Sequence, residues 1–567
     1  MSVSREMVVR HQQTAALGGW SARPVGFGGG SAYENAAPGL FGRGGNIVFS
    51  GYNVGNRDVI RERKSAVRNA RIVDRNNALI HAGINKRATN LVGTNLRMRH
   101  MPNWRMLSRL DPRMDEVWAL EFADAYENLW SLWADDPRNL IDAERHLTFG
   151  GLMNLAARNT YGADGETMVI VRYDEERRDR YNGAFATFLE VIDTDRISNR
   201  PTTQNGRFRS DGRILDEWGA AIAFDIETRH PSDPIGTRDW VEVQRETSWG
   251  RPVAIHWFNK HRAGFQRGMP AILHALRDVK MLDKFDDFTL KAAALAAFLS
   301  IYVKSEGTTT EVLKRMQTQT PTGDKTELES LWDAKFGLYE ELDIAAEGQR
   351  LPILPPGDEI AAVTANRAAD NTDSFHYIFE RKMAAILELG TANFTGDYSR
   401  TSFASIRAEF MDAWRSTVQT RHQFTQAVGA PINMAFMEEC LAQDMLPIPA
   451  GAPDFYENVV AYTQCEFRGP GMGTIDPVKD PTGAGIAIAG GLSNPQDEAA
   501  ARGTDLIENI DAIASAQAYA KRKGVELRWG NTPPATPGSA ADQAKQNAAG
   551  GEENDDVEET EEENPDE

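Results

Sequence analysis

Residues 269–299 (MPAILHALRDVKMLDKFDDFTLKAAALAAFL) and residues 374–389 (SFHYIFERKMAAILEL) decide the fold, because both predict long helices on either side of a less regular insert. Pro270 fits the first turn of the first helix, where a missing N–H costs no hydrogen bond. Gly390 follows the second helix and can adopt the left-handed conformation that ends many helices. The insert, residues 304–368, contains the turn-rich strings TQTPTGDKTE and LPILPPGDE. The sequence therefore predicts two long helices that frame a separate small element.

A polar loop and a third long helix follow. The loop, residues 390–402 (GTANFTGDYSRTS), exceeds the roughly two to eight residues usual between helices, and long loops are often functional. The helix is expected to begin near Phe403 and, at about 26 residues, to be about 39 Å long. Its apolar residues recur at helical spacing and predict a buried stripe of Phe403, Ile406, Phe410, Trp414 and Val418.

The chain before residue 269 mixes helix and strand signals. Residues 57–109 look helical and are basic, with thirteen Lys or Arg against three acidic residues. Asp111-Pro112 predicts a helix start, because Asp caps helices and Pro fits the first turn. An apolar stripe on that helix is assigned to the core and not to base stacking: Phe122, Tyr126, Leu129, Trp130 and Trp133. Short strands are predicted at 167–173, 188–192, 220–226 and 253–258, and a helical hairpin at 495–525.

Composition excludes several classes of protein. The formal net charge is −20, whereas proteins that coat DNA along its length are basic. The only cysteines are Cys440 and Cys465, so no disulfide framework or four-cysteine zinc site is possible, and we expect two reduced thiols. The N-terminus does not look like a signal peptide. The longest apolar run, Ala292 to Val303, is too short to span a membrane, so we expect a soluble protein.

The two ends of the chain differ in composition from the rest. Residues 1–55 are rich in Gly, Ser, Ala and Asn and are expected to form a mobile arm. Residues 531–567 end in EENDDVEETEEENPDE, with eleven acidic and no basic residues after Lys545. We expect this tail to be disordered and solubilising, with the alternative that it binds a basic partner.

Motifs that carry catalysis are missing. There is no G-x-x-x-x-G-K-[ST] phosphate loop, since TGDKT at residues 322–326 lacks the first glycine. There is also no H-E-x-x-H or G-x-S-x-G motif, and His256 and His261 are the one pair of histidines within five residues of each other. The sequence therefore predicts no catalytic residue, no metal site and no cofactor, and a protein that is not an enzyme.

Several segments, in this order and spacing, carry a resemblance to a known family. They include residues 62–104 (ERKSAVRNARIVDRNNALIHAGINKRATNLVGTNLRMRHMPNW), 132–149 (LWADDPRNLIDAERHLTF), 162–173 (GADGETMVIVRY), 193–199 (DTDRISN), 267–297, 354–360 (LPPGDEI) and 397–414 (DYSRTSFASIRAEFMDAW). Over about residues 55–525 the chain resembles the lambda-type portal proteins of tailed phages. The N-terminal arm and the acidic tail lie outside the resemblance.

The resemblance implies an α+β portal fold that forms rings, with a mixed α/β wing, a helical stem, a small α/β clip and a helical crown. The boundaries are an arm at 1–55, the wing at 56–267, stem helix 1 at 268–299, the clip at 300–370, stem helix 2 at 371–389, a tunnel loop at 390–402, a long helix and return to the wing at 403–480, the crown at 481–530 and the acidic tail at 531–567.

The resemblance also implies a function and partners. Such a subunit assembles into a ring of twelve copies at one capsid vertex, through which viral DNA is packaged and ejected. It contacts double-stranded DNA without sequence specificity, docks terminase and then a head-completion or adaptor protein, and meets the major capsid protein or scaffold. No membrane is involved. The location is the virion, with assembly in the host cytoplasm.

Two sets of residues are expected to face the DNA. In the tunnel loop they are Asn393, Phe394, Asp397, Tyr398, Ser399 and Arg400, and the alternative is an ordinary connection between helices. On stem helix 1 they are Lys280, Lys284 and Lys291, which share one face. The alternative for the lysines is pairing with Asp283 and Asp287 on a solvated surface.

Other interpretations remain open. The basic stretch 57–109 faces capsid or scaffold, lies over DNA inside the head, or is a solvated surface. The whole chain could instead be another head-assembly protein such as a minor capsid protein, or a nuclease or protease of the assembly machinery. A minor capsid protein would lack the helix–insert–helix–loop–helix succession at 268–428, and a nuclease would need a cluster of acidic residues.

Overall fold

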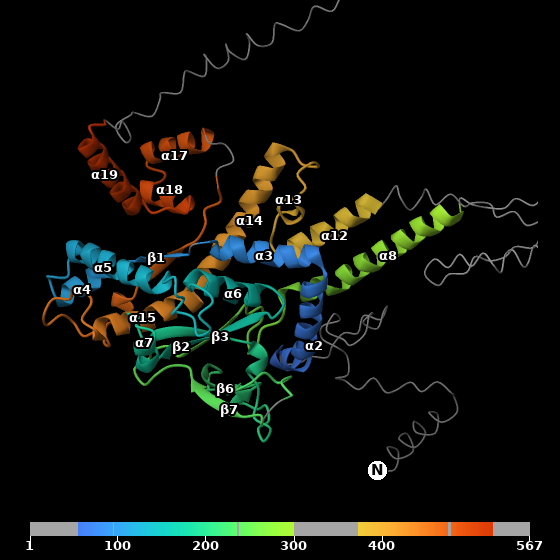
Figure 1. The fold of residues 1–567 in the computed structure, drawn as a ribbon, viewed down its shortest axis with the longest axis horizontal. Helices are drawn as coiled ribbons and strands as arrows, with labels where there is room; N and C mark the ends of the chain where they lie inside the picture. Colours follow the sequence, from blue (N-terminus) through green and yellow to red (C-terminus); the bar gives the residue numbers. More distant parts are fainter. Residues whose placement is uncertain (1–54, 95, 235–236, 300–371, 474–477, 526–567) are drawn as a thin grey trace, which may run out of the picture. The chain divides into compact units, whose positions relative to one another are not determined.

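The structure is a computed structural model of the chain (Figure 1) that describes residues 55–94, 96–234, 237–299, 372–473 and 478–525. The predicted N-terminal arm, the clip and the acidic tail lie outside these residues. The chain divides into two compact units. The first holds residues up to Ile84 together with Met269–Asp397, and the second holds Asn85–Gly268 and Tyr398 onward.

The first unit is helical. It contains α2 (Gly55–Asn76), the start of α3 (Ala78–Val92), the short helix η4 (Ala271–Ala275), α8 (Leu276–Leu299), α12 (Thr372–Ile386) and α13 (Thr391–Thr395). The long helix that was predicted to begin at Met269 therefore starts as the 3₁₀ helix η4 and continues as the α-helix α8. Helices α8 and α12 pack through aromatic side chains, and the Phe285 and Phe375 rings lie 4.4 Å apart.

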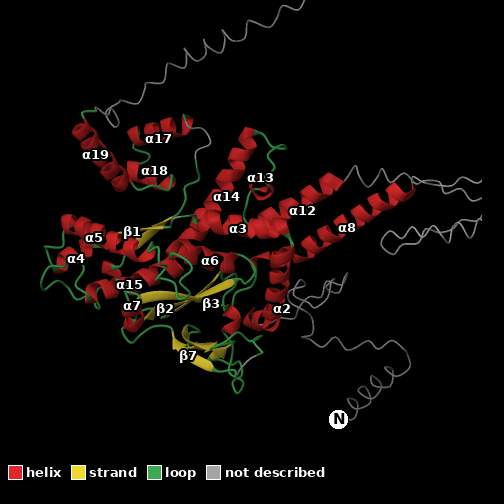
Figure 2. Cartoon of the chain, in the orientation of Figure 1, coloured by secondary structure: helices red, strands yellow, loops and turns green. Residues whose placement is uncertain are grey.

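The second unit contains three small antiparallel sheets (Figure 2). The central one has the order β3-β2-β8, from β2 (Glu166–Tyr173), β3 (Thr187–Ile192) and β8 (Ala254–Phe258). A four-stranded sheet is formed by β4 (Arg209–Ser210), β5 (Arg213–Leu215), β6 (Ala221–Glu227) and β7 (Trp240–Gln244). The third sheet is formed by β1 (Arg97–His100) and β9 (Cys465–Arg468), which are far apart in the sequence and pair with each other. The four predicted strands are present within a residue or so, and β1, β4, β5, β7 and β9 are additions.

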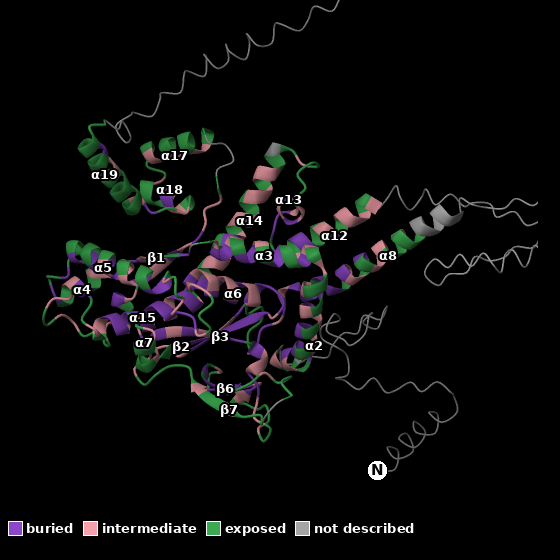
Figure 3. Cartoon of the chain, in the orientation of Figure 1, coloured by how far each residue is buried: buried purple, intermediate pink, exposed green. Residues whose placement is uncertain are grey.

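Aromatic residues form the centre of the second unit. Figure 3 colours the buried stretches of the chain purple. The predicted stripe lies on α5 (Glu116–Ala134), and four of its five residues are buried while Leu129 packs against the core. Rings from α5, α6 (Phe149–Tyr161), α15 (Ala430–Ala442) and β9 meet here, in a cluster that we call the aromatic core: Trp130, Trp133, Phe149, Phe436 and Phe467. The Trp133 and Phe436 rings stack at 4.3 Å. The assignment of the stripe to the core is confirmed.

The predicted start of α5 is wrong. Asp111 ends the preceding helix, α4 (Trp104–Leu110), and its carboxylate pairs with Arg113 at 2.6 Å. Helix α5 begins at Glu116, where the side chain of Asp115 accepts a hydrogen bond from the Trp118 amide at 3.0 Å. Two Asp residues four positions apart both suit a cap, and local sequence did not distinguish them.

The third long helix is confirmed, but its buried stripe is wrong. Helix α14 (Phe403–Phe424) continues through a π-helical turn (Thr425–Gly429) into α15. Ile406, Phe410 and Trp414 are half-buried and Val418 is 46% exposed. Among the described residues from 404 to 429, only Thr417, Phe424, Thr425, Val428 and Gly429 are buried, and the side chain of Phe403 lies outside the described part.

The last described helices bury few residues. They are α17 (Lys479–Ala489), α18 (Pro495–Ala501) and α19 (Leu506–Lys523), whereas α16 (Val459–Tyr462) before them buries Ala461 and Tyr462. Helices α18 and α19 form the predicted helical hairpin. In the described part of residues 478–525, only Ala499, Asp505 and Ala520 are buried.

Candidate functional site

The stem lysines lie on a helix whose other face is packed. Val279 and Leu282 of α8 are buried, and on α12 Phe379 and Met383 are buried. Lys280 and Lys284 are half-buried and Lys291 is exposed. The packed residues orient α8, so that the three lysines occupy the remaining part of its surface.

Acidic residues on α8 have partners other than the stem lysines. Asp278 pairs with Lys382 at 3.5 Å and Asp286 with His376 at 2.8 Å, both across to α12. The carboxylate of Asp283 accepts a hydrogen bond from Asn77 at 3.0 Å. Burial and the nearby charges of two other Asp residues raise the pKa of Asp283. Asp283, which the alternative interpretation offered to the lysines, thus bonds to Asn77.

The predicted polar loop is partly helical. Helix α13 occupies residues 391–395 and ends at Gly396, whose φ of 79° lies in the left-handed region that favours glycine. Phe394 is 2% exposed, and a Cβ on Gly83 would lie only 2.5 Å from its ring. Phe394 is therefore a packing residue of the first unit, and Asn393 beside it is half-buried.

The exposed part of the loop is short. Asp397, Tyr398, Ser399 and Arg400 are all exposed, and Tyr398 is 47% exposed. The side chain of Ser402 caps α14 by accepting the Ser405 amide at 3.3 Å. Two helix ends therefore bracket a run of exposed residues that carries one acidic, one basic and one aromatic side chain.

A buried ionic cluster lies just before the first stem helix, and sequence patterns did not reveal it. Arg267 is fully buried, and its guanidinium donates to Glu166 at 2.6 Å and to Asp211 at 2.9 Å. It also donates to three backbone carbonyls, at 3.0, 2.8 and 2.9 Å. The Glu166 carboxylate accepts the Gly268 amide at 2.8 Å. The end of the Asn85–Gly268 segment of the second unit is thereby anchored just before the chain continues into η4 and α8.

Electrostatic attraction and close packing both restrict which residues can occupy this ionic cluster. Burial would lower the pKa of Arg267, but the attraction of Glu166 and Asp211 outweighs it and raises the pKa. Burial lowers the pKa of His256, which contacts Glu166 at 3.2 Å, to about 4. A Cβ on Gly268 would lie 2.1 Å from the carbonyl oxygen of Gly165, so only glycine fits there. A single arginine between polar neighbours carries no periodic signal, which is why it was missed.

Other reactive groups in the described residues are few. Asp193, Asp195 and His230 place three possible metal-ligand atoms within 4.8 Å of one another on the surface. Cys440 and Cys465 are free thiols, as expected, and burial raises the pKa of Cys465 to about 12. Among the described helices, none combines the length and apolar character needed to cross a membrane.

Comparisons with known proteins agree on one family. Residues 50–421 match the family described as phage portal protein, lambda family. The chain is 26% identical to portal protein B of Escherichia phage lambda over 448 residues, which cover 78% of this chain and 81% of that protein. It is 25% identical to the portal protein of Escherichia phage N15, over 78% of this chain and 82% of that protein. A solved structure of the neck of an empty GTA particle, computed with C6 symmetry, contains a similar chain with a TM-score of 0.40 and 13% identity, covering 80% of this chain and 95% of that one.

Proposed function

Because the chain belongs to the lambda family of phage portal proteins, it is a portal subunit, and we propose that copies of it close into a ring whose channel carries double-stranded DNA. The observation that carries the proposal is the family match over residues 50–421, which spans both stem helices and the loop between α12 and α14. We propose twelve copies, located at one vertex of the capsid in the virion and assembled in the host cytoplasm.

Within this proposal, α8 and α12 are the stem and the residues after Gly396 are the tunnel loop. Duplex DNA carries one negative charge for about every 1.7 Å of its axis, so a strongly basic lining would hold each phosphate and resist sliding. Asp397, Tyr398 and Arg400 offer instead one charge of each sign and one ring. Lys280, Lys284 and Lys291 would add bands of point charges along the stem.

The remaining boundaries and partners complete the proposal. Of the wing at 56–267, residues 85–267 lie in the second unit together with the long helix and the return to the wing, whereas residues 56–84 lie in the first unit. Helices α17–α19 correspond to the crown. Terminase docks during packaging and a head-completion or adaptor protein afterwards, while the capsid protein or scaffold surrounds the ring. We propose that the subunit acts without catalysis or cofactor.

The loop is tested by substitution of its exposed residues. Deleting Phe394 would remove a buried ring and damage packing, so the informative variant is Tyr398→Ala/Arg400→Ala. We expect rings of normal size by electron microscopy, but phage heads that package less DNA or lose it on storage. The matched control is Phe208→Ala/Arg207→Ala, an exposed aromatic–arginine pair in the second unit. Full-length, stable genomes in the loop variant would overturn the assignment.

The absence of catalysis is tested separately. Purified rings are incubated with duplex DNA and Mg²⁺ or Mn²⁺, and we expect no cleavage. Asp193, Asp195 and His230 are the described residues best placed to hold a metal ion. Cleavage that disappears in Asp193→Asn would show that the protein is also a nuclease and would refute this part of the proposal.

A further inference from the structure

Helix α2 of the first unit carries a continuous row of cations. Residues Arg57, Arg61, Lys64, Arg68, Arg71 and Arg75 are spaced alternately four and three positions apart. That spacing averages close to 3.6 residues per turn, so all six lie along one face. At about 1.5 Å per residue the row is about 27 Å long. We call these six residues the cation row; α2 is labelled in Figure 1.

The opposite face of α2 fixes the orientation of the row. Its apolar residues are buried, namely Val59, Ala66, Val67, Ala70 and Val73. Five members of the row are exposed and Arg71 is half-buried. Packing of the apolar face thus turns the basic residues outward, which sequence spacing alone could not establish.

Basic residues outnumber acidic residues on α2. Glu62 is buried, and Asp74 contacts His81 at 3.0 Å. Seven basic and three acidic residues give the helix a formal charge of +4, in a chain whose net charge is −20. A local excess of this kind raises the concentration of anions at the surface.

The chemistry of the row favours phosphates over a protein surface. Protein interfaces are enriched in aromatic residues, and α2 contains none. Its one large apolar residue that is exposed is Ile72. Five of the six cations are arginines, whose planar guanidinium matches phosphate geometry. Over about 27 Å of axis the two strands of a duplex present about 16 phosphate charges, so a straight row of this length can contact several phosphates.

We propose that the cation row of α2 binds the backbone of double-stranded DNA without reading its sequence, as a contact additional to the stem lysines and the tunnel loop. That the anion is DNA rests on the proposed function, which places this chain beside a packaged genome. The row holds DNA through arginine–phosphate contacts, so the affinity falls steeply with salt.

The test uses assembled full-length rings and covalently closed circular DNA, which has no end to thread into a channel. Binding is measured between 50 and 200 mM NaCl for Arg61→Gln/Lys64→Gln/Arg68→Gln. We expect at least a tenfold loss of affinity at low salt. The slope of log K against log salt should become shallower by about 2.7 for each engaged helix, since each phosphate contact contributes about 0.9. A second variant, Arg57→Gln/Arg75→Gln, should lower the slope by about 1.8 on the same basis.

Two controls separate the row from general charge. Arg105→Gln/Arg109→Gln/Arg207→Gln removes three exposed arginines elsewhere and should bind as the unmodified ring does. Arg61→Lys/Arg68→Lys keeps the charges and should retain most of the affinity. Equal losses in the row variant and in the charge-matched control would overturn the proposal.

A protein partner is the other outcome that would overturn it. If the row variants bind circular DNA normally but fail to enter capsid shells, the row contacts coat protein or scaffold instead. The proposed function fails independently: rings that bind circular DNA through α2 but never pass linear DNA, whatever the state of Tyr398 and Arg400, would refute the channel and leave the row intact.

Discussion

The aromatic core and the C-terminal helices are parts of the same compact unit, yet they are held by different forces. The aromatic core packs rings from α5, α6, α15 and β9 with side chains at most 5% exposed. Helices α17, α18 and α19 bury almost nothing, and several large apolar residues on them are exposed, including Ile486, Ile510 and Tyr519.

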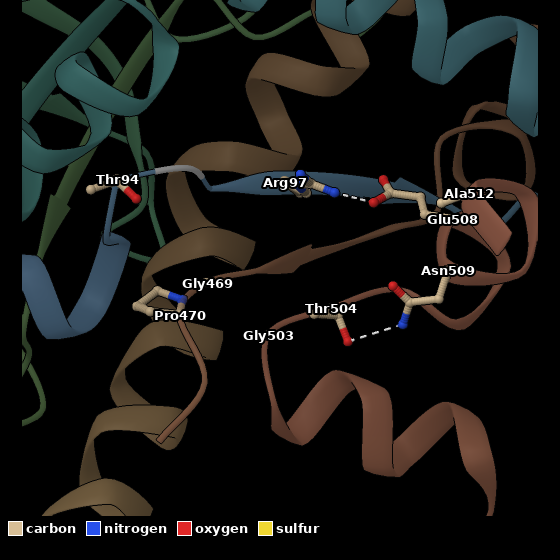
Figure 4. Close-up of a pocket in the computed structure, with 9 residues that line it drawn as sticks. All are labelled: Thr94, Arg97, Gly469, Pro470, Gly503, Thr504, Glu508, Asn509 and Ala512. Carbon is tan, nitrogen blue, oxygen red and sulfur yellow. Dashed lines mark hydrogen bonds and ion pairs between the residues drawn. The ribbon is translucent and has the colours of Figure 1, made fainter. Parts of the chain in front are cut away.

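Arginine–carboxylate contacts attach the C-terminal helices to the rest of the unit. Asp505, the N-cap of α19, is 6% exposed and pairs with Arg468 of β9 and, at 3.7 Å, with Arg99 of β1. Arg97 pairs with Glu508 one turn further along α19. The Arg97–Glu508 pair borders a pocket of about 410 Å³ (Figure 4), whose lining includes Thr504 and Asn509.

The comparison shows how one unit can combine a rigid and a releasable part. Burial of apolar area stabilises by about 25 cal/mol per Å² and is insensitive to moderate salt. The Arg97–Glu508 pair, whose side chains are about half exposed, contributes about 0–1 kcal/mol and is screened by salt, whereas the contacts of Asp505 are less exposed and are screened less. The C-terminal helices should therefore detach under conditions that leave the aromatic core folded.

The largest loss of stability should follow a substitution in the aromatic core. Trp133→Ala removes a ring that stacks on Phe436 and donates a hydrogen bond to the Thr187 carbonyl at 2.8 Å. Denaturant unfolding should show a loss of about 3–5 kcal/mol. Leu132→Ala, an adjacent residue that is 66% exposed, is the control and should be close to neutral. Similar losses in both variants would mean that the stacked rings are not the source of stability.

A slightly smaller effect is expected where ionic contacts are fully buried. Arg267→Met leaves the Glu166 carboxylate without its guanidinium partner and should cost about 3 kcal/mol, part of which is relieved if the carboxylate takes up a proton. Thermal unfolding measures the loss. Exposed Arg207→Met serves as control, and a neutral Arg267→Met would show that burial does not strengthen the ionic contacts of this unit.

Stability should fall on acidification because of two buried histidines. Burial lowers the pKa of His100 to about 3, with Arg99 lowering it further, and lowers that of His256 to about 4. Between those values and about 6.5 the unfolded chain binds protons that the folded chain does not. The stabilisation is therefore complete above pH 6.5 and decreases by about 1.4 kcal/mol per pH unit for each histidine as pH falls. His100→Gln should flatten the pH dependence measured by denaturant unfolding.

The smallest expected effect concerns the attachment of the C-terminal helices. Asp505→Ala removes a helix cap and two arginine contacts, and should weaken the protection of α18 and α19 amides in hydrogen exchange by about 1–2 kcal/mol. Raising NaCl to 1 M should likewise weaken the protection of the α18 and α19 amides in the unmodified chain. Asp511→Ala, exposed on the same helix, is the control. If aromatic-core amides lose protection together with α19, the two regions are not independent.

Local patterns predicted most of the elements. Apolar residues at helical spacing marked α5 and α14, Pro270 and Gly390 marked the start and end of the two stem helices, and runs of apolar and β-branched residues marked four strands, because these signals are properties of neighbouring residues. Partners distant in the chain were not predictable in this way. Strand β1 lies opposite β9 across more than 360 residues, and Arg97 alone gives no sign of its pairing with Arg468.

The candidate site shows the same division. The sequence predicted an unusually long polar loop at residues 390–402. Phe394 is buried beside Gly83, however, so it is not one of the exposed residues of that loop. Similarly, the apolar stripe of α14 has helical spacing, yet Val418 is exposed, because spacing says which residues share a face and not whether that face is covered.

By itself, the sequence determined the order of helices and strands, the resemblance to one family and the spacing of the basic residues on α2. Only the tertiary structure decided which faces are buried, that Glu166 and Arg267 form an internal ion pair, and that the cation row points outward. The physical reason is that periodicity arises from backbone geometry within a few residues, whereas burial and pairing depend on segments brought together from about a hundred or more residues away.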